Sequence, residues 1–479
     1  MVFVAVAVAT ALVYALWVVW VPLLPGNLYV PLLDLGKITG YTWVSAALYL
    51  GIVLVLFALY GLGYRAIRAS HSRVKTAWIF ITGVVVCAEL VWAYPATAVD
   101  VFGYIAGGQL LALHQVNPFV VAPNAYPRDP ILSFLAFPDE PSQYGPAWVL
   151  LSGGIAALSG SDLLAEMLLY KVLAAAAHVG SAAVIYAIAK RLTDSPVSAR
   201  ASAYLFLMNP LLLWEMVGNA HNDGLMMLFG LCGVWLFVVG HDLFALMGIA
   251  AGALIKVPIA LIGPVIFVGV LRRSWARAIE GTLLGLALVF VVYRPFWVGP
   301  ETLTALRRTD LFTASLGSVV RLALLPSLGV ADASTAARTL SLTAFAVIAV
   351  VSVLLAFQAE TDVDRLRPAY FTLLGALLLL TTWFQAWYIV WPFALGAALA
   401  EPRRHLEVAL LSLGGLLQYF VFIYLWVMGL FPPVENLGVQ VTAYLAIVGP
   451  LLVMLVWRAA PRVRLPLARG ISPPSAEYH

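Results

Sequence analysis

The sequence predicts an all-α integral membrane protein, a polytopic bundle of membrane-spanning helices. Of its 479 residues, 63% are hydrophobic and only 10% are charged, whereas soluble domains carry roughly 25% charged residues. Apolar runs of about 20 residues recur along the whole chain, as expected of helices that cross a bilayer. The ~10-residue alternation of membrane β-strands is not seen. These three observations together favour helices.

Fourteen apolar segments are predicted to span the membrane. The first has no basic residue before it and exceeds the ~7–15-residue apolar core of a signal peptide, so we expect it to be retained. The apolar stretch 243–271 is divided at Val257-Pro258, because a single helix there would place Arg272 and Arg273 on the opposite side. The predicted spans are 2–24, 42–62, 76–95, 163–189, 201–217, 224–240, 243–256, 258–271, 277–297, 340–357, 369–382, 386–400, 406–429 and 440–457.

Basic residues between the spans predict the orientation. Lys and Arg concentrate in cytoplasmic loops; with fourteen spans all six basic clusters fall on one side, so both termini are predicted to be cytoplasmic. The apolar segment 147–160 is short and would move Lys190 and Arg191 outside if it spanned, so we expect a re-entrant or interfacial helix. The clusters are Arg65, Arg68, Arg73 and Lys75; Lys190, Arg191 and Arg200; Arg272, Arg273 and Arg277; Arg365 and Arg367; Arg403 and Arg404; and Arg458, Arg462, Arg464 and Arg469.

This topology leaves two larger segments outside the cell. Residues 96–146 form a first extracytoplasmic loop after the third span, and residues 298–339 form a second segment. The first loop is rich in proline and aromatic residues, which predicts a rigid, structured cap, because disordered linkers lack aromatic residues. Residues 459–479 are predicted to form a basic cytoplasmic tail that is disordered near its end.

The composition argues against several other functions. No basic cluster is interleaved with aromatic residues, so the net charge of +4 does not indicate nucleic-acid binding. Cys87 and Cys232 lie in apolar runs and are expected to be inert buried thiols. One histidine and one aspartate between two spans, His221 and Asp223, do not make a coordination sphere, so no metal site is predicted.

Asp100 is the first candidate catalytic residue. It follows the third span directly, and Tyr104 would share its face if the segment is helical, because the two are four residues apart. A carboxylate at the edge of a membrane is well placed to act as a general base. The alternative is that Asp100 caps the N-terminus of the helix that follows it. The residues alone do not decide between the two.

A second polar group lies in "GNAHNDGLMM" (218–227), between two spans. His221, Asn222 and Asp223 stand where the membrane begins again, which invites a functional interpretation. These side chains have the chemistry to position an acceptor hydroxyl or contact a phosphate. The alternative is that Asn219 or Asn222 caps the next helix.

Two cations and one aromatic turn complete the candidates. Lys256 and Arg294 lie at the ends of spans, where each either extends harmlessly to the lipid headgroups or neutralises a lipid phosphate. The segment "TTWFQAWYIVWP" (381–392) turns between two spans. Its Trp383 and Tyr388 are typical of interfacial aromatic belts, and they also suit stacking on a sugar, to which Gln385 would hydrogen-bond.

Five stretches taken together resemble a known superfamily. They are "DVFGYIAGGQLLALHQVNPFVVAP" (100–123), "PSQYGPAW" (141–148), "LMNPLLLWEMVGNAHNDGLMM" (207–227), "YRPFWVG" (293–299) and "WFQAWYIVWP" (383–392). The chain resembles the GT-C superfamily of polyprenol-phosphate-sugar-dependent glycosyltransferases, most of all the bacterial α-mannopyranosyltransferases that use polyprenol-phosphate mannose. The resemblance covers about residues 76–430. It implies a GT-C-like catalytic core over 76–458, with 1–62 as an N-terminal two-helix addition.

The resemblance also implies a mechanism. Asp100 takes the place of the superfamily's essential loop acid and would deprotonate the acceptor hydroxyl, with inversion at the sugar. Many members have two adjacent acids, whereas Asp100 stands alone, so dependence on a divalent metal is left open and no cofactor is required. Lys256, Arg294 and His221 would bind the donor phosphate. The residues expected to bind substrate are Tyr104, Asn117, Tyr144, Asn222, Asp223, Trp383, Gln385 and Tyr388.

The expected function is the transfer of a sugar, best taken as mannose, to an extracytoplasmic lipid-anchored glycan or lipoglycan of the cell envelope. The donor would be a sugar linked to polyprenyl phosphate. The enzyme would lie in the cell membrane with its active site on the extracytoplasmic face. The alternative is a polytopic transporter or lipid flippase. Proline-broken helices such as that at Asn209-Pro210 fit a transporter, but no internal repeat is found.

Overall fold

The computed structural model describes residues 2–69, 74–307 and 311–459, and the regular secondary structure of this part is helical apart from two isolated β-bridges. The predicted all-α class is therefore confirmed. Each of the fourteen predicted spans contains a helix. The α-helices are α1 (Val2–Trp20), α2 (Leu35–Thr39), α3 (Trp43–Ala69), α4 (Thr76–Leu90), α5 (Asp100–Ala112), α6 (Pro146–Ser159), α7 (Leu163–Thr193), α8 (Pro196–Leu207), α9 (Pro210–Leu212), α10 (Asp223–Val238), α11 (Asp242–Ala253), α12 (Gly263–Leu271), α13 (Trp275–Tyr293), α14 (Leu316–Gln358), α15 (Asp362–Gly375), α16 (Val390–Ala398), α17 (Pro402–Tyr419) and α18 (Leu437–Ala459).

Seven helices within the described ranges are long and apolar enough to cross a membrane, or eight if one bent pair counts as a single span. The bent pair consists of Pro210–Gly218 and α10, which meet at 112°. Ala220 turns the chain between them, with a φ of 57° that side chains other than glycine rarely adopt. Several of the fourteen predicted segments are therefore shorter than a membrane-crossing helix, and the number fourteen stays a prediction.

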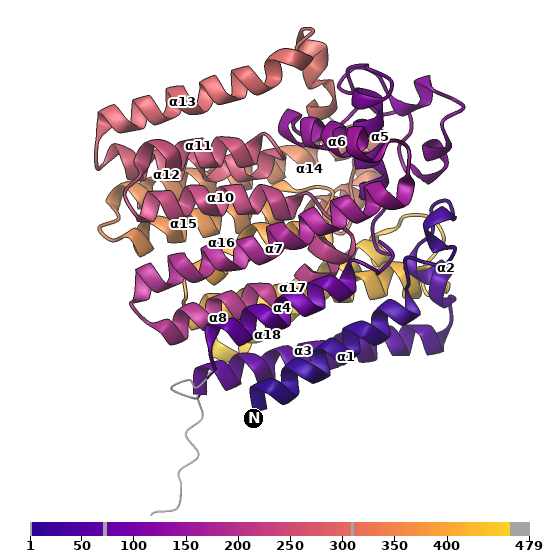
Figure 1. Cartoon of the computed structure of the whole chain (residues 1–479), viewed down its shortest axis with the longest axis horizontal. Helices are drawn as coiled ribbons and strands as arrows, with labels where there is room; N and C mark the ends of the chain where they lie inside the picture. Colours follow the sequence, from indigo (N-terminus) through magenta and orange to yellow (C-terminus); the bar gives the residue numbers. More distant parts are fainter. Residues whose placement is uncertain (1, 70–73, 308–310, 460–479) are drawn as a thin grey trace, which may run out of the picture.

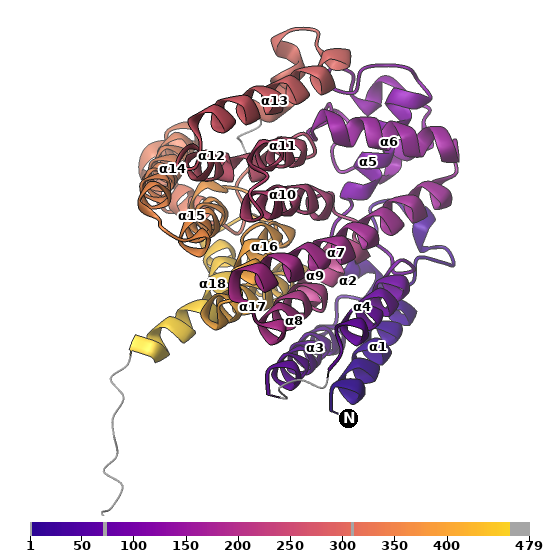
Figure 2. The same cartoon turned by 60° about the vertical axis from the view of Figure 1, so that its left-hand side comes forward.

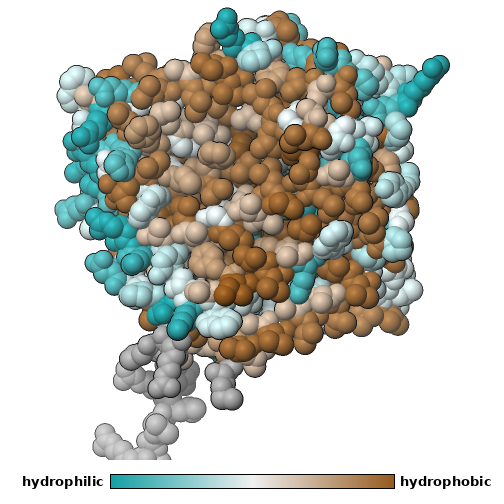
Figure 3. All heavy atoms as spheres, viewed as in Figure 1, coloured by the Kyte–Doolittle hydropathy of each residue, from teal (hydrophilic) through white to brown (hydrophobic). Residues whose placement is uncertain are grey.

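The helices lie side by side in one bundle, and their long axes share a common direction (Figures 1 and 2). α2, α5 and α6 gather at one end, which we call the α5 end. A hydrophobic band covers the middle of the molecule, and hydrophilic residues concentrate at both ends (Figure 3). Large apolar side chains such as Phe290, Val347 and Val453 are exposed within the helices. Such a belt is what lipid contact requires.

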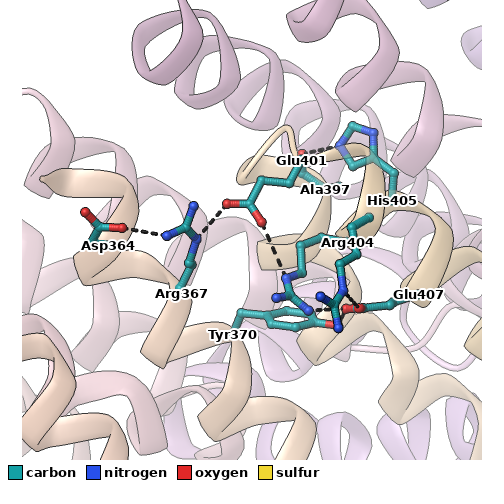
Figure 4. A network of polar contacts seen from close by, with 9 residues as sticks. Asp364, Arg367, Tyr370, Ala397, Glu401, Arg404, His405 and Glu407 are labelled. Atoms are coloured by element: carbon teal, nitrogen blue, oxygen red, sulfur yellow. Dashed lines mark hydrogen bonds and ion pairs between the residues drawn. The ribbon is translucent and has the colours of Figure 1, made fainter. Parts of the chain in front are cut away.

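The basic clusters meet at the end of the bundle opposite α5. Arg200 donates to the carbonyl of Val74 (3.0 Å), and Arg273 forms ion pairs with Asp242 (2.9 Å) and Asp362 (2.7 Å). Further ion pairs continue this arrangement: Arg367 with Glu401, and Arg403 and Arg404 with Glu407 (Figure 4). These contacts join the first predicted cluster to the second, and the third to the fourth and fifth. Most of the sixth, together with residues 460–479 of the predicted tail, lies outside the described residues.

The loop between α1 and α3 is hydrogen-bonded to the segment that leads into α5. The amide of Leu23 donates to the Trp92 carbonyl (2.8 Å), and the amide of Leu35 donates to the Ala96 carbonyl (2.8 Å). In α3, the Tyr49 hydroxyl donates to the Leu416 carbonyl of α17 (2.8 Å). Residues of α1 and α3 belong to the same hydrophobic core as those of the later helices. The helices α1 and α3 are thus packed into the bundle.

Two predicted loops contain more helix than expected. The first, 96–146, contains α5 and two short 3-10 helices, η2 (Pro123–Ala125) and η3 (Pro130–Phe134). In the second, 298–339, α14 already starts at Leu316, because Ser315 caps it and an apolar run follows. The helix breaks only at Gly329, whose φ is 76°. The segment 147–160, expected as a re-entrant or interfacial helix, forms α6.

Candidate active site

A cavity of about 380 Å³ opens at the α5 end of the bundle, and we call it the reaction cavity. It lies between α5, the end of the loop 113–145, the start of the 3-10 helix η5 (Val257–Ile262), and the aromatic turn before α16. Five of the predicted site residues line it although they are far apart in the sequence: Asp100, Tyr144, Lys256, Trp383 and Tyr388.

Asp100 is the first residue of α5 and is half-buried. Its carboxylate lies in the first turn of the helix, where the exposed backbone amides favour a negative charge. Val99 occupies the N-cap position and makes no capping hydrogen bond. The alternative of a capping aspartate is therefore not observed. The Oδ1 atom of Asp100 instead accepts a hydrogen bond from the hydroxyl of Tyr144 (3.0 Å).

The Tyr144 hydroxyl is held in its donating form. Burial, and next the negative charge of Asp100, raise the pKa of Tyr144 well above its ordinary value. Tyr104 packs edge-on against the Tyr144 ring, with 4.7 Å between the ring centroids. Asp100 and Tyr104 therefore both face Tyr144, which confirms the predicted shared helix face.

Lys256 is the only cationic residue in the described lining of the reaction cavity. Its ammonium group donates to Oδ2 of Asp223 (2.6 Å) and lies 4.9 Å from the centre of the Tyr388 ring. Oδ1 of Asp223 accepts from the indole of Trp391 (2.7 Å). The Asp223 side chain is fully buried, whereas 16% of the Lys256 side chain is exposed. Asp223 thus holds the cation at the cavity wall.

Backbone hydrogen bonds fix Lys256 relative to Tyr144. The amides of Gly145 and Ala147 donate to the carbonyls of Ile255 (2.9 Å) and Leu254 (3.0 Å). A side chain at Gly145 would meet the Leu254 carbonyl oxygen at 2.0 Å, so only glycine permits this approach. The start of α6 and the segment before η5 are consequently locked together.

The polar residues between η4 (Leu213–Gly218, a π-helical turn) and α10 lie behind the cavity. The Tyr104 hydroxyl donates to the Asn222 side chain (3.3 Å), and both residues are buried. His221 does not line the cavity; it stacks on Trp387, which does, with 4.0 Å between the rings. Asn222 precedes α10 but makes no side-chain capping bond. His221 therefore supports a lining residue from behind, and Asn222 bonds to Tyr104, which packs on Tyr144.

Glu215 was not predicted as a site residue, yet it organises this layer. It is fully buried and accepts from Thr97 (3.0 Å) and Asn219 (2.8 Å). Its Oε2 atom lies 3.2 Å from Nε2 of His221. An acid within the apolar run "LLLWEMVG" was the signal available in the sequence. π-helical turns such as η4 are frequent at functional sites.

Lys171 is a second buried ionisable residue that the sequence analysis missed. Its ammonium donates to the carbonyls of Leu90, at the end of α4 (3.4 Å), and of Gly218, at the end of η4. Helix C-termini present unpaired carbonyls and a partial negative charge, which a lysine stabilises. Lys171 thus supports the point where two helices end beneath the site.

Seven predicted site residues lie outside the cavity lining. Tyr104, His221, Asn222 and Asp223 lie behind it, as described above, and the other three lie elsewhere. Arg294 is exposed at the end of α13. Asn117 donates to the Phe296 carbonyl (2.7 Å) and so fastens the chain after Arg294 to the first loop. Gln385 faces a different cavity, described below. Glu140 lines the reaction cavity as a second acid, and no cluster of three potential metal-binding side chains occurs within the ranges described.

The membrane bundle brings an acid, a cation and aromatic rings around one cavity, and comparisons with known proteins identify the class of protein as a mannosyltransferase. Residues 2–272 match the family described as "Alpha-(1->6)-mannopyranosyltransferase, N-terminal domain". The chain belongs to this family, and it is an α-mannosyltransferase. The match includes α1 and α3, which are therefore part of the domain that this family shares.

Two curated relatives carry corresponding names. The chain is 25% identical over 420 residues to alpha-(1->6)-mannopyranosyltransferase A of Mycobacterium tuberculosis, an alignment that covers 82% of the chain and 76% of the relative. It is 25% identical over 187 residues to alpha-(1->6)-mannopyranosyltransferase B of Corynebacterium glutamicum, covering 38% and 29%. The alternative of a transporter or flippase gains no support from these relatives.

Proposed function

We propose that the protein transfers mannose from a polyprenyl-phosphate donor to a hydroxyl of a lipid-anchored glycan, with inversion at the anomeric carbon. The observation that carries the proposal is the convergence of Asp100 and Lys256 on one cavity. Transfer from a lipid phosphate requires a base for the acceptor and a positive charge for the leaving group. The reaction cavity offers both kinds of group.

In the proposed reaction, Asp100 accepts the proton of the acceptor hydroxyl while the oxygen attacks C1 of mannose. The bond between C1 and the donor phosphate oxygen breaks, and polyprenyl phosphate leaves with the electron pair. The hydrogen bond from Tyr144 holds the carboxylate in position. Lys256 balances the charge that develops on the phosphate, and Asp223 keeps the ammonium at the wall until the donor binds. Arg294, which is exposed, remains a predicted donor contact only.

We propose that the α5 end faces away from the cytoplasm and that both termini are cytoplasmic. The basic clusters lie at the opposite end, and positive loops are retained in the cytoplasm. The reaction cavity would then open where lipid-linked glycans are elongated outside the membrane.

The proposal is tested in membranes that contain the protein and radiolabelled polyprenyl-phosphate mannose. We expect wild type to transfer mannose to a lipid or glycan product, and Asp100→Asn to lose at least about 100-fold, as removal of a general base does. Asp139→Asn, an exposed acid of the same loop, is the matched control and should transfer normally.

Glu140→Gln identifies the base if Asp100 is not the residue. Transfer retained in Asp100→Asn but lost in Glu140→Gln would move the base to Glu140. Transfer retained in both variants would show that neither acid is the general base. If wild type uses a nucleotide sugar and ignores the polyprenyl donor, the proposed donor class is wrong.

A further inference from the structure

A second cavity, of about 450 Å³, adjoins the reaction cavity, and Trp383 lines both. Its walls come from distant parts of the chain. Asp34 and Tyr41 belong to the connection between α1 and α3, Thr97 precedes α5, and Gln418 lies in α17. Trp383 is the residue that the two linings share, so a ligand in contact with this indole lies at the junction of the two spaces.

The lining of the second cavity combines aromatic rings with neutral or acidic polar groups. Tyr41 and Trp383 supply rings, Gln385 and Gln418 supply amides, and Asp34 supplies a carboxylate. Neither lysine nor arginine is present in the lining as described. A pyranose has an apolar C–H face that packs on aromatic rings and hydroxyls that bond to amides and carboxylates. A phosphate would meet Asp34 without a cation in the lining.

Gln418 provides an independent indication of a ligand. Its side chain is 5% exposed, and its carboxamide oxygen has no hydrogen-bond partner among the described residues. A buried amide oxygen without a donor is destabilising, so such groups are normally satisfied by water or by a ligand. A sugar hydroxyl is the kind of donor that this oxygen lacks.

Asp34 and Tyr41, the lining residues from the connection between α1 and α3, are fixed in place by hydrogen bonds. Asp34 caps α2 by accepting from the Lys37 amide (2.8 Å), and it also accepts from the Tyr41 hydroxyl (3.0 Å). The Lys37 ammonium lies 3.5 Å from Asp34 but is bound to the Leu32 carbonyl (2.7 Å), outside the lining. Burial and the hydrogen bond from Tyr41 to Asp34 raise the pKa of Tyr41 to about 12, so the Tyr41 hydroxyl keeps its proton.

We propose that the second cavity binds hexopyranose units of the acceptor glycan, next to the unit whose hydroxyl reacts in the first cavity. The proposal rests on the proposed function, and it assigns to the α1–α3 connection a part in choosing the acceptor. Trp383 then contacts the acceptor at the junction between the two sites.

The kinetic test uses purified protein in detergent, a polyprenyl-phosphate mannose donor and an alkyl mannotrioside as acceptor. In Asp34→Asn and in Gln385→Ala, the acceptor KM rises about tenfold, as loss of one or two hydrogen bonds predicts, while the donor KM is unchanged. Gln358→Ala, an exposed glutamine at the end of α14, is the control. An unchanged acceptor KM overturns the proposal. So does a rise in the donor KM, which would assign the cavity to the prenyl chain.

A binding test separates this proposal from the proposed function. Free mannotriose should quench tryptophan fluorescence in the wild type, because Trp383 and Trp426 line the cavity, and Gln385→Ala should weaken the binding about tenfold. Binding without any transfer from the polyprenyl donor would sink the proposed function and keep the sugar site. Transfer without mannotriose binding, or equal binding in wild type and variant, would sink the sugar site.

Discussion

Removal of the Lys256 charge should damage stability and activity by separable amounts. Lys256→Met leaves the fully buried Asp223 carboxylate with the Trp391 indole as its remaining side-chain partner among the described residues. Removal of one member of a buried ion pair costs about 3–5 kcal/mol. Because 16% of Lys256 is exposed and the indole bond remains, we expect the lower end, about 3 kcal/mol.

The double variant Lys256→Met/Asp223→Asn distinguishes the two effects. It removes both charges, and the asparagine oxygen still accepts from Trp391, so most of the stability should return. Transfer should stay about 10²–10³-fold down, the usual effect of losing one group that stabilises developing charge.

The assay is thermal unfolding in detergent beside mannose transfer in membranes. Lys190→Met, an exposed lysine at the end of α7, is the control and should match wild type in both. A double variant as unstable as Lys256→Met would contradict the account of the buried charge. Normal transfer by the double variant would remove Lys256 from the chemistry.

Three further predictions follow from the site. Tyr144→Phe removes the hydrogen bond to Asp100. Transfer should fall about tenfold or more, since a bond to a charged group contributes about 1.5–3 kcal/mol. An unchanged rate would exclude a positioning role for Tyr144. Because burial and the charge of Asp100 raise the pKa of Tyr144, its hydroxyl stays protonated past pH of about 10, so wild type and Tyr144→Phe should share the same alkaline limb in a pH–rate profile. Gly145→Ala should destabilise by about 1–3 kcal/mol through its clash with the Leu254 carbonyl, whereas Gly154→Ala, with open space around it, should unfold at or above the wild-type temperature.

The helical class and the positions of the helices were predictable because apolar runs this long have few alternatives in a membrane protein. The number of spans was not, because several helices are broken at prolines or turns such as Ala220. A window of hydropathy does not distinguish a short spanning helix from one half of a bent pair. The start of α14 at Leu316 was missed because its capping serine lies within a segment read as a loop.

The candidate site was predictable where a polar residue stood out against an apolar background. Asp100 and Lys256 were found in this way, and the structure brings them to one cavity. The contacts between candidates were harder to predict. The Asp223–Lys256 ion pair joins the start of α10 to the connection between α11 and η5, and no spacing in the sequence encodes it. Glu215 and Lys171 were not among the predicted residues because both lie within apolar runs and not beside a polar loop, although a buried charge in such a run is itself a functional signal.

The hydrogen bond between Tyr49 and Leu416 has a consequence for how the chain assembles. The two residues are 367 positions apart. α3, one of the first helices to be synthesised, therefore meets α17 only after most of the chain has been made. Contacts of such long range are slow to form, because the intervening chain must first be ordered. The α1–α3 pair must therefore wait in the bilayer with part of its packing surface uncovered. Early release of an unfinished chain would leave this surface, and the second cavity beside it, open.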